Sequence, residues 1–378
     1  MKPIRVLFAG GGTGGHLTPG LAVAEELQRR MPDSEIMFIG TDKRIERLMV
    51  ESSGFRRVGL GGRTPGEGKW TLPAQAFWLL QSMWKSRRVV KKFKPDVVVG
   101  LGGYGCAGPA TLAAVRGLPL MLLEQNVIPG RATKLFARWS DEVCCQFHES
   151  VPRLKQNKVA LTGNPVRERI GSCKRDIAAK QLGLEEGLRT LLVLGGSQGA
   201  LPLNEVMIAI APLLAERRKS FQIIHIAGKH KIDRVRAAYA GNKIVARVDE
   251  FLENMDAAYA LADLALCRAG GTSLAELATT GVPSILVPYP HGADDHQTYN
   301  AAAFVEKGAS ILIRQSELEP EKLNELISGL LWDDIRLKMM KQSSLSLATP
   351  HAARIVVDHL LEIAKRQPDT SMSRAAAL

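Results

Sequence analysis

The sequence predicts an α/β protein built from two Rossmann-like domains, each with a doubly wound parallel sheet. Three observations support this fold class: short β-rich runs alternate with helix-like stretches, glycine-rich turns follow several runs, and one strand–turn–helix pattern occurs twice. The 378 residues exceed what one hydrophobic core usually serves, which also favours two domains. With 46% hydrophobic and 23% charged residues, the composition excludes disordered, collagen-like and coiled-coil classes.

The expected strands are short apolar runs, each separated from the next by a stretch long enough for a helix or a connecting loop. In chain order they cover 5–10, 35–40, 96–101, 119–125, 142–147, 159–163, 190–195, 222–227, 244–251, 264–268, 284–288 and 309–314. Strands that alternate with helices pair in parallel, because each crossover returns the chain to the same end of the sheet.

An internal repeat indicates where each domain begins. Arg5-Val-Leu-Phe-Ala-Gly-Gly-Gly-Thr-Gly-Gly15 and Arg189-Thr-Leu-Leu-Val-Leu-Gly-Gly-Ser-Gln-Gly199 share one plan of basic residue, apolar strand and glycine turn. Gly163 and Pro165 interrupt regular structure between them. We expect an N-terminal domain over 1–166, a C-terminal domain over 167–346, a helix within 347–365 that returns to the N-terminal domain, and a disordered tail at 366–378.

Cysteine content and hydropathy predict a reduced, intracellular protein. The five cysteines are odd in number and form no Cys-x-x-Cys pair, so neither a disulfide framework nor a zinc site is indicated. No run of 18 apolar residues occurs, and little precedes the first strand. Neither a membrane span nor a signal peptide is therefore expected.

The net charge of +12 is concentrated in the N-terminal part. Residues 1–166 hold 24 Lys and Arg against 13 Asp and Glu, whereas the rest of the chain holds 26 against 25. This asymmetry predicts an anionic partner for one half. Nucleic acid is not expected to be that partner, because no nucleic-acid-binding module is recognisable.

The densest basic cluster, residues 69–94, has the pattern of an amphipathic helix. One predicted stripe, expected to face the core, comprises Leu72, Leu79, Met83 and Val90, and a second comprises Phe77, Leu80, Trp84, Arg88 and Lys91. Rings followed by cations suit a helix that lies in the interface of an anionic membrane. The alternative is that the second stripe packs within the domain and the basic residues are solvated.

The first glycine loop fits the dinucleotide-binding pattern Gly10-x-Gly12-x-x-Gly15. Glycines let backbone N–H groups approach a pyrophosphate, and the helix that follows attracts its charge. Alone, the loop is compatible with a nicotinamide oxidoreductase, with Asp42 at the ribose. His16 directly after the loop is either structural or a group beside an anion site.

Two further glycine loops follow predicted strands, at Gly195-Gly-Ser-Gln-Gly199 and at Gly100-Leu-Gly-Gly-Tyr-Gly105. The first has a hydroxyl among backbone donors, as a second phosphate site requires. The alternative for each is a tight turn that holds no ligand. Two phosphate-type loops in two similar domains favour an enzyme that joins two phosphorylated partners, because a dehydrogenase needs only one such loop.

Two C-terminal segments have side chains suited to a sugar nucleotide. Cys267-Arg-Ala-Gly-Gly-Thr-Ser-Leu-Ala-Glu276 begins a helix, and Glu276 is able to accept hydrogen bonds from two ribose hydroxyls; its alternative role is merely to favour the helix N-terminus. In the second segment, His296, Gln297 and Asn300 are candidates for sugar hydroxyls. No metal site is predicted, and no Asp-x-Asp sequence occurs.

Taken in order, the motifs resemble the MurG family of GT-B glycosyltransferases. They are Gly10-Gly-Gly-Thr-Gly-Gly-His16, Gly102-Gly-Tyr-Gly, Glu124-Gln-Asn126, Gly163-Asn-Pro-Val-Arg167, Gly195-Gly-Ser-Gln-Gly199, Cys267 to Glu276 and His296-Gln-Thr-Tyr-Asn300. The resemblance spans roughly residues 4–365, and seven motifs in one order make chance agreement implausible. The loop from His291 to Asp295 is longer than the family's, and His296 stands where some members have glutamine.

The resemblance implies an inverting transferase of peptidoglycan synthesis, and so a role in cell shape and division. Its partners would be UDP-N-acetylglucosamine, the acceptor undecaprenyl-pyrophosphoryl-muramoylpentapeptide (lipid I), the anionic cytoplasmic face of the inner membrane, and other cell-wall synthesis proteins. The fold implied is GT-B, with two domains facing across a cleft. No cofactor is required, and a divalent ion is at most an assistant.

The resemblance also assigns roles to residues. The implied donor-binding set is Thr13, Gly14, Gly15, Asn126, Arg167, Ser197, Leu252, Gly271, Thr272, Ser273, Leu274, Ala275, Glu276 and Gln297, with Leu252 contributing a backbone contact to uracil. His16 is the candidate general base, with orientation of the acceptor diphosphate as the alternative role. A UDP-N-acetylglucosamine epimerase of the same fold is a second candidate function, and a nicotinamide oxidoreductase is a third.

Overall fold

The computed structural model describes residues 3–61, 72–154, 158–196, 199–229, 232–290 and 292–365, the side chains of 72–76 and 293 excepted. The chain forms two compact units: unit 1 is Met1–Arg167 with Thr349–Leu378, and unit 2 is Glu168–Ala348. The first division falls one residue beyond the boundary expected from the sequence, because Arg167 pairs with Glu25 inside unit 1. The tail expected to be disordered, 366–378, lies outside the described residues.

Unit 1 contains a parallel sheet with the strand order β3-β2-β1-β4-β5-β6-β7. The strands are β1 (Arg5–Gly10), β2 (Glu35–Gly40), β3 (Arg56–Gly59), β4 (Val97–Gly102), β5 (Leu120–Glu124), β6 (Glu142–Cys145) and β7 (Val159–Leu161). The helices are α1 (Gly14–Arg30), α2 (Arg44–Ser52), α3 (Leu72–Phe93), α4 (Tyr104–Arg116), α5 (Arg131–Phe136) and α14 (Ala352–Lys365), with 3-10 turns at Ala137–Trp139 and His148–Arg153.

Unit 2 repeats this topology, with the parallel order β10-β9-β8-β11-β12-β13. Its strands are β8 (Arg189–Leu194), β9 (Phe221–Ile226), β10 (Ala246–Asp249), β11 (Leu264–Cys267), β12 (Ser284–Leu286) and β13 (Ser310–Leu312). Its helices are α6 (Arg175–Leu182), α7 (Leu201–Leu214), α8 (Ile232–Gly241), α9 (Met255–Leu261), α10 (Gly271–Thr280), α11 (His296–Glu306), α12 (Pro320–Leu331) and α13 (Asp334–Ser346), with 3-10 turns at Ala215–Arg217, Ala293–Asp295 and Gln315–Glu317. The predicted class of two doubly wound parallel sheets is confirmed.

The sequence prediction missed one strand. β3 reads Arg-Arg-Val-Gly and lies at the edge of the unit 1 sheet, so it has no apolar run to mark it. The other strands are found where they were expected, with ends that shift by one or more residues. Edge strands need little burial, and this is why hydrophobic pattern alone fails to reveal them.

Both faces of the unit 1 sheet are buried, as a doubly wound sheet requires. Val6 and Phe8 of β1 contribute to one core, which also contains residues of α1 and α14. Leu7 and Ala9 of the same strand contribute to the opposite core, with residues of α3 and α4. The alternation of side chains along a strand therefore fixes which helices cover which face.

The buried face of α3 differs from the stripe predicted by the sequence. Leu79 and Met83 are only half-buried, whereas Val90 of the predicted stripe is buried, together with Trp78, Ser82 and Ser86. The fourth member of the predicted stripe, Leu72, has a side chain outside the described part of the structure. Helix α4 passes so close that a Cβ at Gly108 would collide with Ser82. Only a small side chain fits at this crossing, so the face is rotated toward serines that a hydrophobic pattern ignores.

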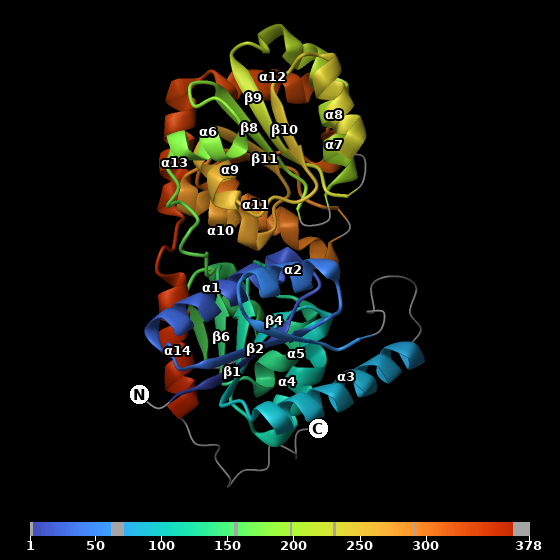
Figure 1. Cartoon of the computed structure of the whole chain (residues 1–378), viewed down its shortest axis with the longest axis vertical. Helices are drawn as coiled ribbons and strands as arrows, with labels where there is room; N and C mark the ends of the chain where they lie inside the picture. The colour runs from blue at the N-terminus through green and yellow to red at the C-terminus, as the bar shows by residue number, and fades with distance from the viewer. Residues whose placement is uncertain are drawn as a thin grey trace. The chain divides into compact units, whose positions relative to one another are not determined.

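The C-terminal helix α14 lies beside α1 in unit 1 (Figure 1). Val356, Val357, Leu360 and Ile363 enter the same core as β1. Arg30 of α1 pairs with Asp358 at 2.8 Å. The chain therefore leaves unit 1 after Arg167 and re-enters it at Thr349 to complete the core.

The re-entry point depends on a glycine, and this gives a test. Gly163 has φ +75°, and a Cβ there would collide with Thr349. Gly54, in the same unit, has φ +78°, but a Cβ there would meet no neighbouring atom within 4 Å. We expect Gly163→Ala to lower the free energy of unfolding by about 2 kcal/mol more than Gly54→Ala, measured by equilibrium urea unfolding, because both carry backbone strain but only the first also forces a new side chain against Thr349. Equal losses would contradict this account of the re-entry.

Candidate functional site

The first and third glycine loops contact each other where β1 and β4 end. A Cβ at Gly10 would lie 2.7 Å from the carbonyl oxygen of Gly102, and one at Gly103 would collide with the carbonyl oxygen of Gly11. The strands are neighbours in a parallel sheet, so their carboxyl ends lie at the same edge. Ligands of open α/β sheets bind at this edge, which makes the paired loops a candidate site.

His16 lies at this loop pair. Thr13 is the N-cap of α1, and Gly14, Gly15 and His16 form its first turn. The Nδ1 atom of His16 is 3.0 Å from the hydroxyl oxygen of Thr13. A Cβ at Gly102 would lie 3.2 Å from the imidazole ring, so the ring rests against bare backbone. The fold therefore brings together the predicted residues Thr13 to His16 at a helix N-terminus, where the helix dipole favours an anion.

A buried carboxylate lies under the first loop. Glu46 of α2 is 1% exposed and accepts hydrogen bonds from the backbone N–H of Gly12, at 2.5 Å, and from the hydroxyl of Thr41. The guanidinium of Arg57 lies 3.7 Å from the same carboxylate. A Cβ at Gly11 would lie 2.7 Å from the Glu46 carboxyl carbon, so the loop needs glycine to close over it. At least one loop N–H thus donates to an internal carboxyl oxygen.

Asn126 is also held by a buried carboxylate. Glu124, at the end of β5, accepts hydrogen bonds from the backbone N–H and the side-chain amide of Asn126, at 3.0 and 3.1 Å. Its other oxygen accepts from the N–H of Gly130 at 2.8 Å. Glu124 therefore fixes the loop that carries the predicted residue.

Arg167, a predicted donor-binding residue, makes its side-chain contacts with α1 and the end of α2. Its Nε donates to Glu25 of α1 at 3.2 Å, a second guanidinium nitrogen pairs with the same carboxylate, and it also donates to the hydroxyl of Ser53 at 3.2 Å. The side chain is 13% exposed. Arg167 therefore braces α1 against the end of α2 within unit 1.

The second glycine loop, after β8, is as tight as the first. A Cβ at Gly195 would collide with the backbone nitrogen of Ala200, and one at Gly199 would collide with the carbonyl oxygen of Ala227. The loop therefore needs glycine to pass between α7 and the end of β9. The predicted residue Ser197 lies outside the described residues.

The start of α10 carries most of the predicted donor-binding residues of unit 2. They are Gly271, Thr272, Ser273, Leu274, Ala275 and Glu276, which form the first six residues of the helix after β11. Leu274 is fully buried and Leu252 is 7% exposed, so these two offer a ligand little beyond backbone. Glu276 is half-buried, and its Oε2 accepts a hydrogen bond of 2.8 Å from the hydroxyl of Tyr259.

Gln297 and its loop are fixed from within unit 2. In the first turn of α11, the Oε1 of Gln297 accepts from the backbone N–H of Tyr289 at 2.9 Å. Arg268, 8% exposed, donates to the carbonyl oxygens of Val287 and Pro288 at 3.0 and 3.1 Å. Burial lowers the pKa of this guanidinium from its ordinary value. Its hydrogen bonds to the carbonyl oxygens after β12 hold the loop that leads to α11.

The second stripe of α3 is exposed rather than packed within unit 1. The side chains of Phe77, Leu80 and Trp84 are 70%, 65% and 53% exposed. Arg88 lies over the Trp84 ring with 3.5 Å between the guanidinium carbon and the ring centroid, and Lys91 is exposed one turn further on. Exposed rings of this size beside cations are typical of an interaction surface.

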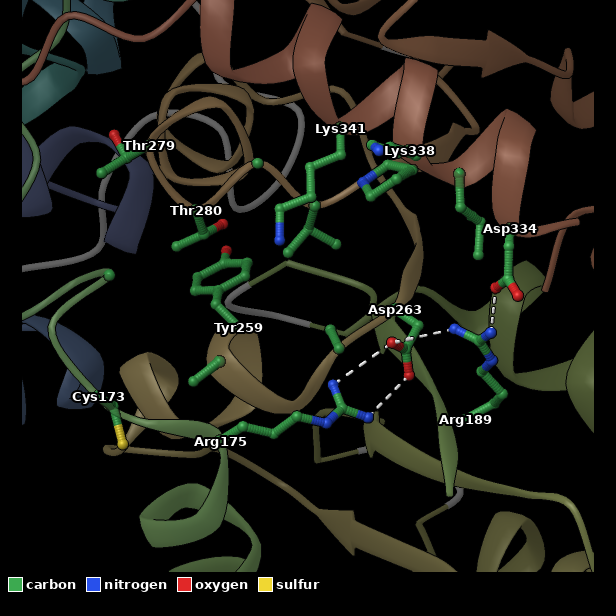
Figure 2. Close-up of a pocket in the computed structure, with 17 residues that line it drawn as sticks. Cys173, Arg175, Arg189, Tyr259, Asp263, Thr279, Thr280, Asp334, Lys338 and Lys341 are labelled. Atoms are coloured by element: carbon green, nitrogen blue, oxygen red, sulfur yellow. Dashed lines mark hydrogen bonds and ion pairs between the residues drawn. The ribbon is translucent and has the colours of Figure 1, made fainter. Parts of the chain in front are cut away.

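Unit 2 also has a surface pocket of about 490 Å³, shown in Figure 2, which none of the predicted site residues lines. Arg175 pairs with Asp263 at 3.0 Å, and Arg189 lies 3.8 Å from Asp263 and also pairs with Asp334. These ions satisfy one another, so this wall is structural. The pocket borders the predicted donor-binding residues of α10: Tyr259, which lines the pocket, contacts the carboxylate of Glu276, and Thr280, which also lines it, contacts the Glu276 carbonyl oxygen.

Among the described residues, no group of three or more His, Cys, Asp and Glu side chains is placed to hold a metal ion. Within the same part of the chain, no helix combines the length and the apolar character needed to cross a membrane.

Sequence reasoning missed two residues that support the site. Glu46 lies 34 residues after Gly12. It belongs to a helix rich in charged residues, where an acidic side chain is expected to be exposed to solvent. Tyr259 stands in an apolar helix and reads as a core aromatic. The one available signal was indirect, because three consecutive glycines at 10–12 indicate that something lies close to the loop without saying what.

Comparison with known proteins relates both units to glycosyltransferases. Residues 6–145 match the glycosyltransferase family 28 N-terminal domain, and residues 190–356 match the C-terminal domain of that family. A Myxococcus xanthus protein named UDP-N-acetylglucosamine--N-acetylmuramyl-(pentapeptide) pyrophosphoryl-undecaprenol N-acetylglucosamine transferase is 38% identical, over 95% of this chain and 93% of its own.

Solved structures agree. The crystal structure of Acinetobacter baumannii MurG matches with a TM-score of 0.71 and 30% identity, over 95% of this chain and 100% of that one. A UDP-GlcNAc 2-epimerase from Neisseria meningitidis matches with a TM-score of 0.65 at 15% identity, over 95% and 100% of the two chains. At that identity the second match shows a shared fold alone.

The carboxylate under the first loop gives a pH prediction. Burial raises the pKa of Glu46 from its ordinary value of 4.5, although Thr41, the Gly12 N–H, Arg57 and Lys43 act in the opposite direction. A raised pKa means that the contribution of Glu46 to stability is fully present below about pH 4.5 and is lost as pH rises through its folded-state pKa. We therefore expect the free energy of unfolding of the unchanged protein to fall relative to that of Glu46→Gln as pH rises above about 4.5, measured by urea unfolding at a series of pH values.

The matched control for this experiment is Glu51→Gln, which changes an exposed acid on the same helix. Its stability should follow that of the unchanged protein at every pH. A constant difference between Glu46→Gln and the unchanged protein would show that Glu46 does not titrate as its burial requires.

Proposed function

The chain belongs to glycosyltransferase family 28, and we propose that it transfers N-acetylglucosamine from UDP-N-acetylglucosamine to lipid I, with inversion, to give lipid II for peptidoglycan synthesis. The observation that carries the proposal is the match, along nearly its whole length, to a protein named for this transfer. The geometry of the separate units is compatible with it: unit 1 presents an imidazole at a helix N-terminus, and unit 2 presents a carboxylate near another.

The donor is held by glycine loops and helix ends in this proposal. UDP gains negative charge as the bond to the sugar breaks, and the N-termini of α7 and α10 present backbone N–H groups to such charge. Glu276 accepts from the ribose hydroxyls, while Gln297 and the loop held by Arg268 serve the sugar. No cofactor is required, since the donor is itself the activated substrate.

His16 is the proposed general base. In the tautomer that suits this role, Nδ1–H donates to the Thr13 hydroxyl and Nε2 takes the proton of the acceptor hydroxyl as the new glycosidic bond forms. Thr13 then acts as a positioning residue, because its contact selects the tautomer. An alternative role, orientation of the acceptor diphosphate at the start of α1, uses the same placement of the ring.

The exposed stripe of α3 is the proposed membrane contact. Phe77, Leu80 and Trp84 would enter the interface while Arg88 and Lys91 meet anionic headgroups. A peripheral position at the cytoplasmic membrane face suits an acceptor anchored by a polyprenyl chain. Roles in cell shape and division, and contacts with other cell-wall proteins, follow as part of the same proposal.

The epimerase alternative rests on fold alone, because the matching epimerase is 15% identical. It also gives no reason for an exposed aromatic and basic stripe. The oxidoreductase alternative is weaker still, since the N–H of Gly12 is taken by Glu46 and Asp42 lies 3.6 Å from Arg57.

The function is tested by UDP release. Purified protein mixed with UDP-N-acetylglucosamine and a lipid I analogue should release UDP well above a control without acceptor. In the same assay His16→Ala should keep its affinity for UDP-N-acetylglucosamine, yet lose about 10²-fold or more in turnover, because a positioned base contributes about that much.

Absence of acceptor-dependent UDP release would overturn the transferase assignment and favour the epimerase, which needs no acceptor. Unchanged turnover of His16→Ala would leave the transferase standing but remove His16 from catalysis.

The membrane contact is tested with vesicles. The double variant Phe77→Glu/Trp84→Glu should lose binding to vesicles that contain phosphatidylglycerol, measured by co-sedimentation, because it places charge where rings would enter the interface. Its activity on a soluble acceptor analogue should be unchanged.

Ile335→Glu/Met339→Glu is the matched control, since these α13 side chains are 76% and 63% exposed in unit 2. It should bind the vesicles as the unchanged protein does. Retained binding by the α3 variant would show that the stripe serves another purpose.

A further inference from the structure

Tyr259 is a buried phenol that reaches the carboxylate of Glu276 from a neighbouring helix. It belongs to α9, whereas Glu276 belongs to α10, and their oxygens are 2.8 Å apart. The Tyr259 side chain is 2% exposed, and its ring lies beside Thr280 at the pocket of Figure 2. A phenol buried this deeply needs a partner for its hydroxyl, and here the partner is a half-buried carboxylate at the candidate nucleotide site.

The direction of this hydrogen bond is fixed by chemistry. Burial, and then the neighbouring Glu276, raise the pKa of Tyr259 well above its ordinary value, so the phenol keeps its proton. An ionised carboxylate only accepts hydrogen bonds. Tyr259 therefore donates and Glu276 accepts, which makes the bond charge-assisted and stronger than a bond between neutral groups.

The threonine hydroxyls that follow Glu276 bond within α10 and do not contact its carboxylate. The hydroxyl of Thr279 donates to the carbonyl oxygen of Ala275 at 2.8 Å, and that of Thr280 donates to the carbonyl oxygen of Glu276 at 2.9 Å. The backbone of Glu276 thus lies in a regular helix, whose neighbouring residues Ala275 and Leu277 are buried. The side chain of Glu276 has three rotatable bonds. If it were disordered before binding, ordering it would weaken the affinity for the ligand about twofold to tenfold.

We infer that Tyr259 is a positioning residue that orients the Glu276 carboxylate toward the ribose hydroxyls of a uridine nucleotide, and so sets a preference for ribose over deoxyribose. The inference rests on the proposed function, because it takes the nucleotide to bind at α10. Two adjacent hydroxyls are recognised by one carboxylate only if its plane is fixed, and the Tyr259 hydrogen bond fixes it before the ligand arrives. Tyr259 itself does not contact the ligand.

The test compares two ligands on one conservative variant. Tyr259→Phe removes only the hydroxyl, and affinities for UDP and for 2′,3′-dideoxy-UDP are measured by isothermal titration calorimetry. UDP affinity should fall about tenfold, as for a lost hydrogen bond to a charged group, whereas dideoxy-UDP affinity should change less than about twofold. A merely structural role would weaken both ligands alike.

Tyr239→Phe is the matched control. Tyr239 is also fully buried in unit 2, and its hydroxyl lies 2.9 Å from Nδ1 of His225 in the core rather than near Glu276. It should keep the ribose preference of the unchanged protein, and thermal melting of both variants reports whether each is folded. Should Tyr259→Phe fail to fold, Tyr259→Leu supplies the test: it also removes the hydroxyl while keeping an apolar side chain in α9, and it should lose the ribose preference as well.

The outcomes separate this inference from the proposed function. If the unchanged protein fails to bind UDP, the proposed function falls and this inference falls with it. If the unchanged protein binds UDP and prefers it to dideoxy-UDP, but Tyr259→Phe keeps the full preference, the inference alone is overturned. An equal loss of affinity for UDP and for dideoxy-UDP in Tyr259→Phe also overturns the inference.

Discussion

Where β1 and β4 end, the polypeptide approaches itself so closely that a Cβ at Gly10 would lie 2.7 Å from the Gly102 carbonyl oxygen. Everything at the unit 1 site depends on this contact between bare backbones. It sets the start of α1, and so the position of Thr13 and His16, and it lets the His16 ring rest on backbone instead of on a flexible side chain. Rigid elements position chemical groups more accurately than loops do, and here two loops gain rigidity by touching.

Three carboxylates recur under or beside these loops and helix starts. Glu46 accepts from the first loop, Glu124 organises the loop of Asn126, and Glu276 accepts from Tyr259. Each is tied by donors from its own unit, so the neighbouring segments keep their shape without a ligand. An anion that binds nearby meets N–H groups already oriented, and this reduces the entropic cost of binding.

Most of the fold could be predicted from the sequence, because buried parallel strands are continuous apolar runs that end at glycine. The exceptions are instructive. β3 has no apolar run, and α3 buries Ser82 and Ser86 because α4 crosses it at Gly108. For the site, glycines and His16 were visible as motifs, whereas Glu46 and Tyr259 were not. Glu46 contacts a loop 34 residues away in sequence, and Tyr259 contacts a residue of a neighbouring helix. Local sequence patterns do not reveal such contacts.

The return of α14 to unit 1 has a consequence for biosynthesis. Val356, Val357, Leu360 and Ile363 belong to the same core as Val6 and Phe8, although they are made at the other end of the chain. As the chain emerges from the ribosome, unit 2 is complete while unit 1 still exposes the apolar surface that α14 will cover. The first unit to be started is thus the last to finish folding, and a chain that ended before α14 would leave unit 2 whole and unit 1 without part of its core.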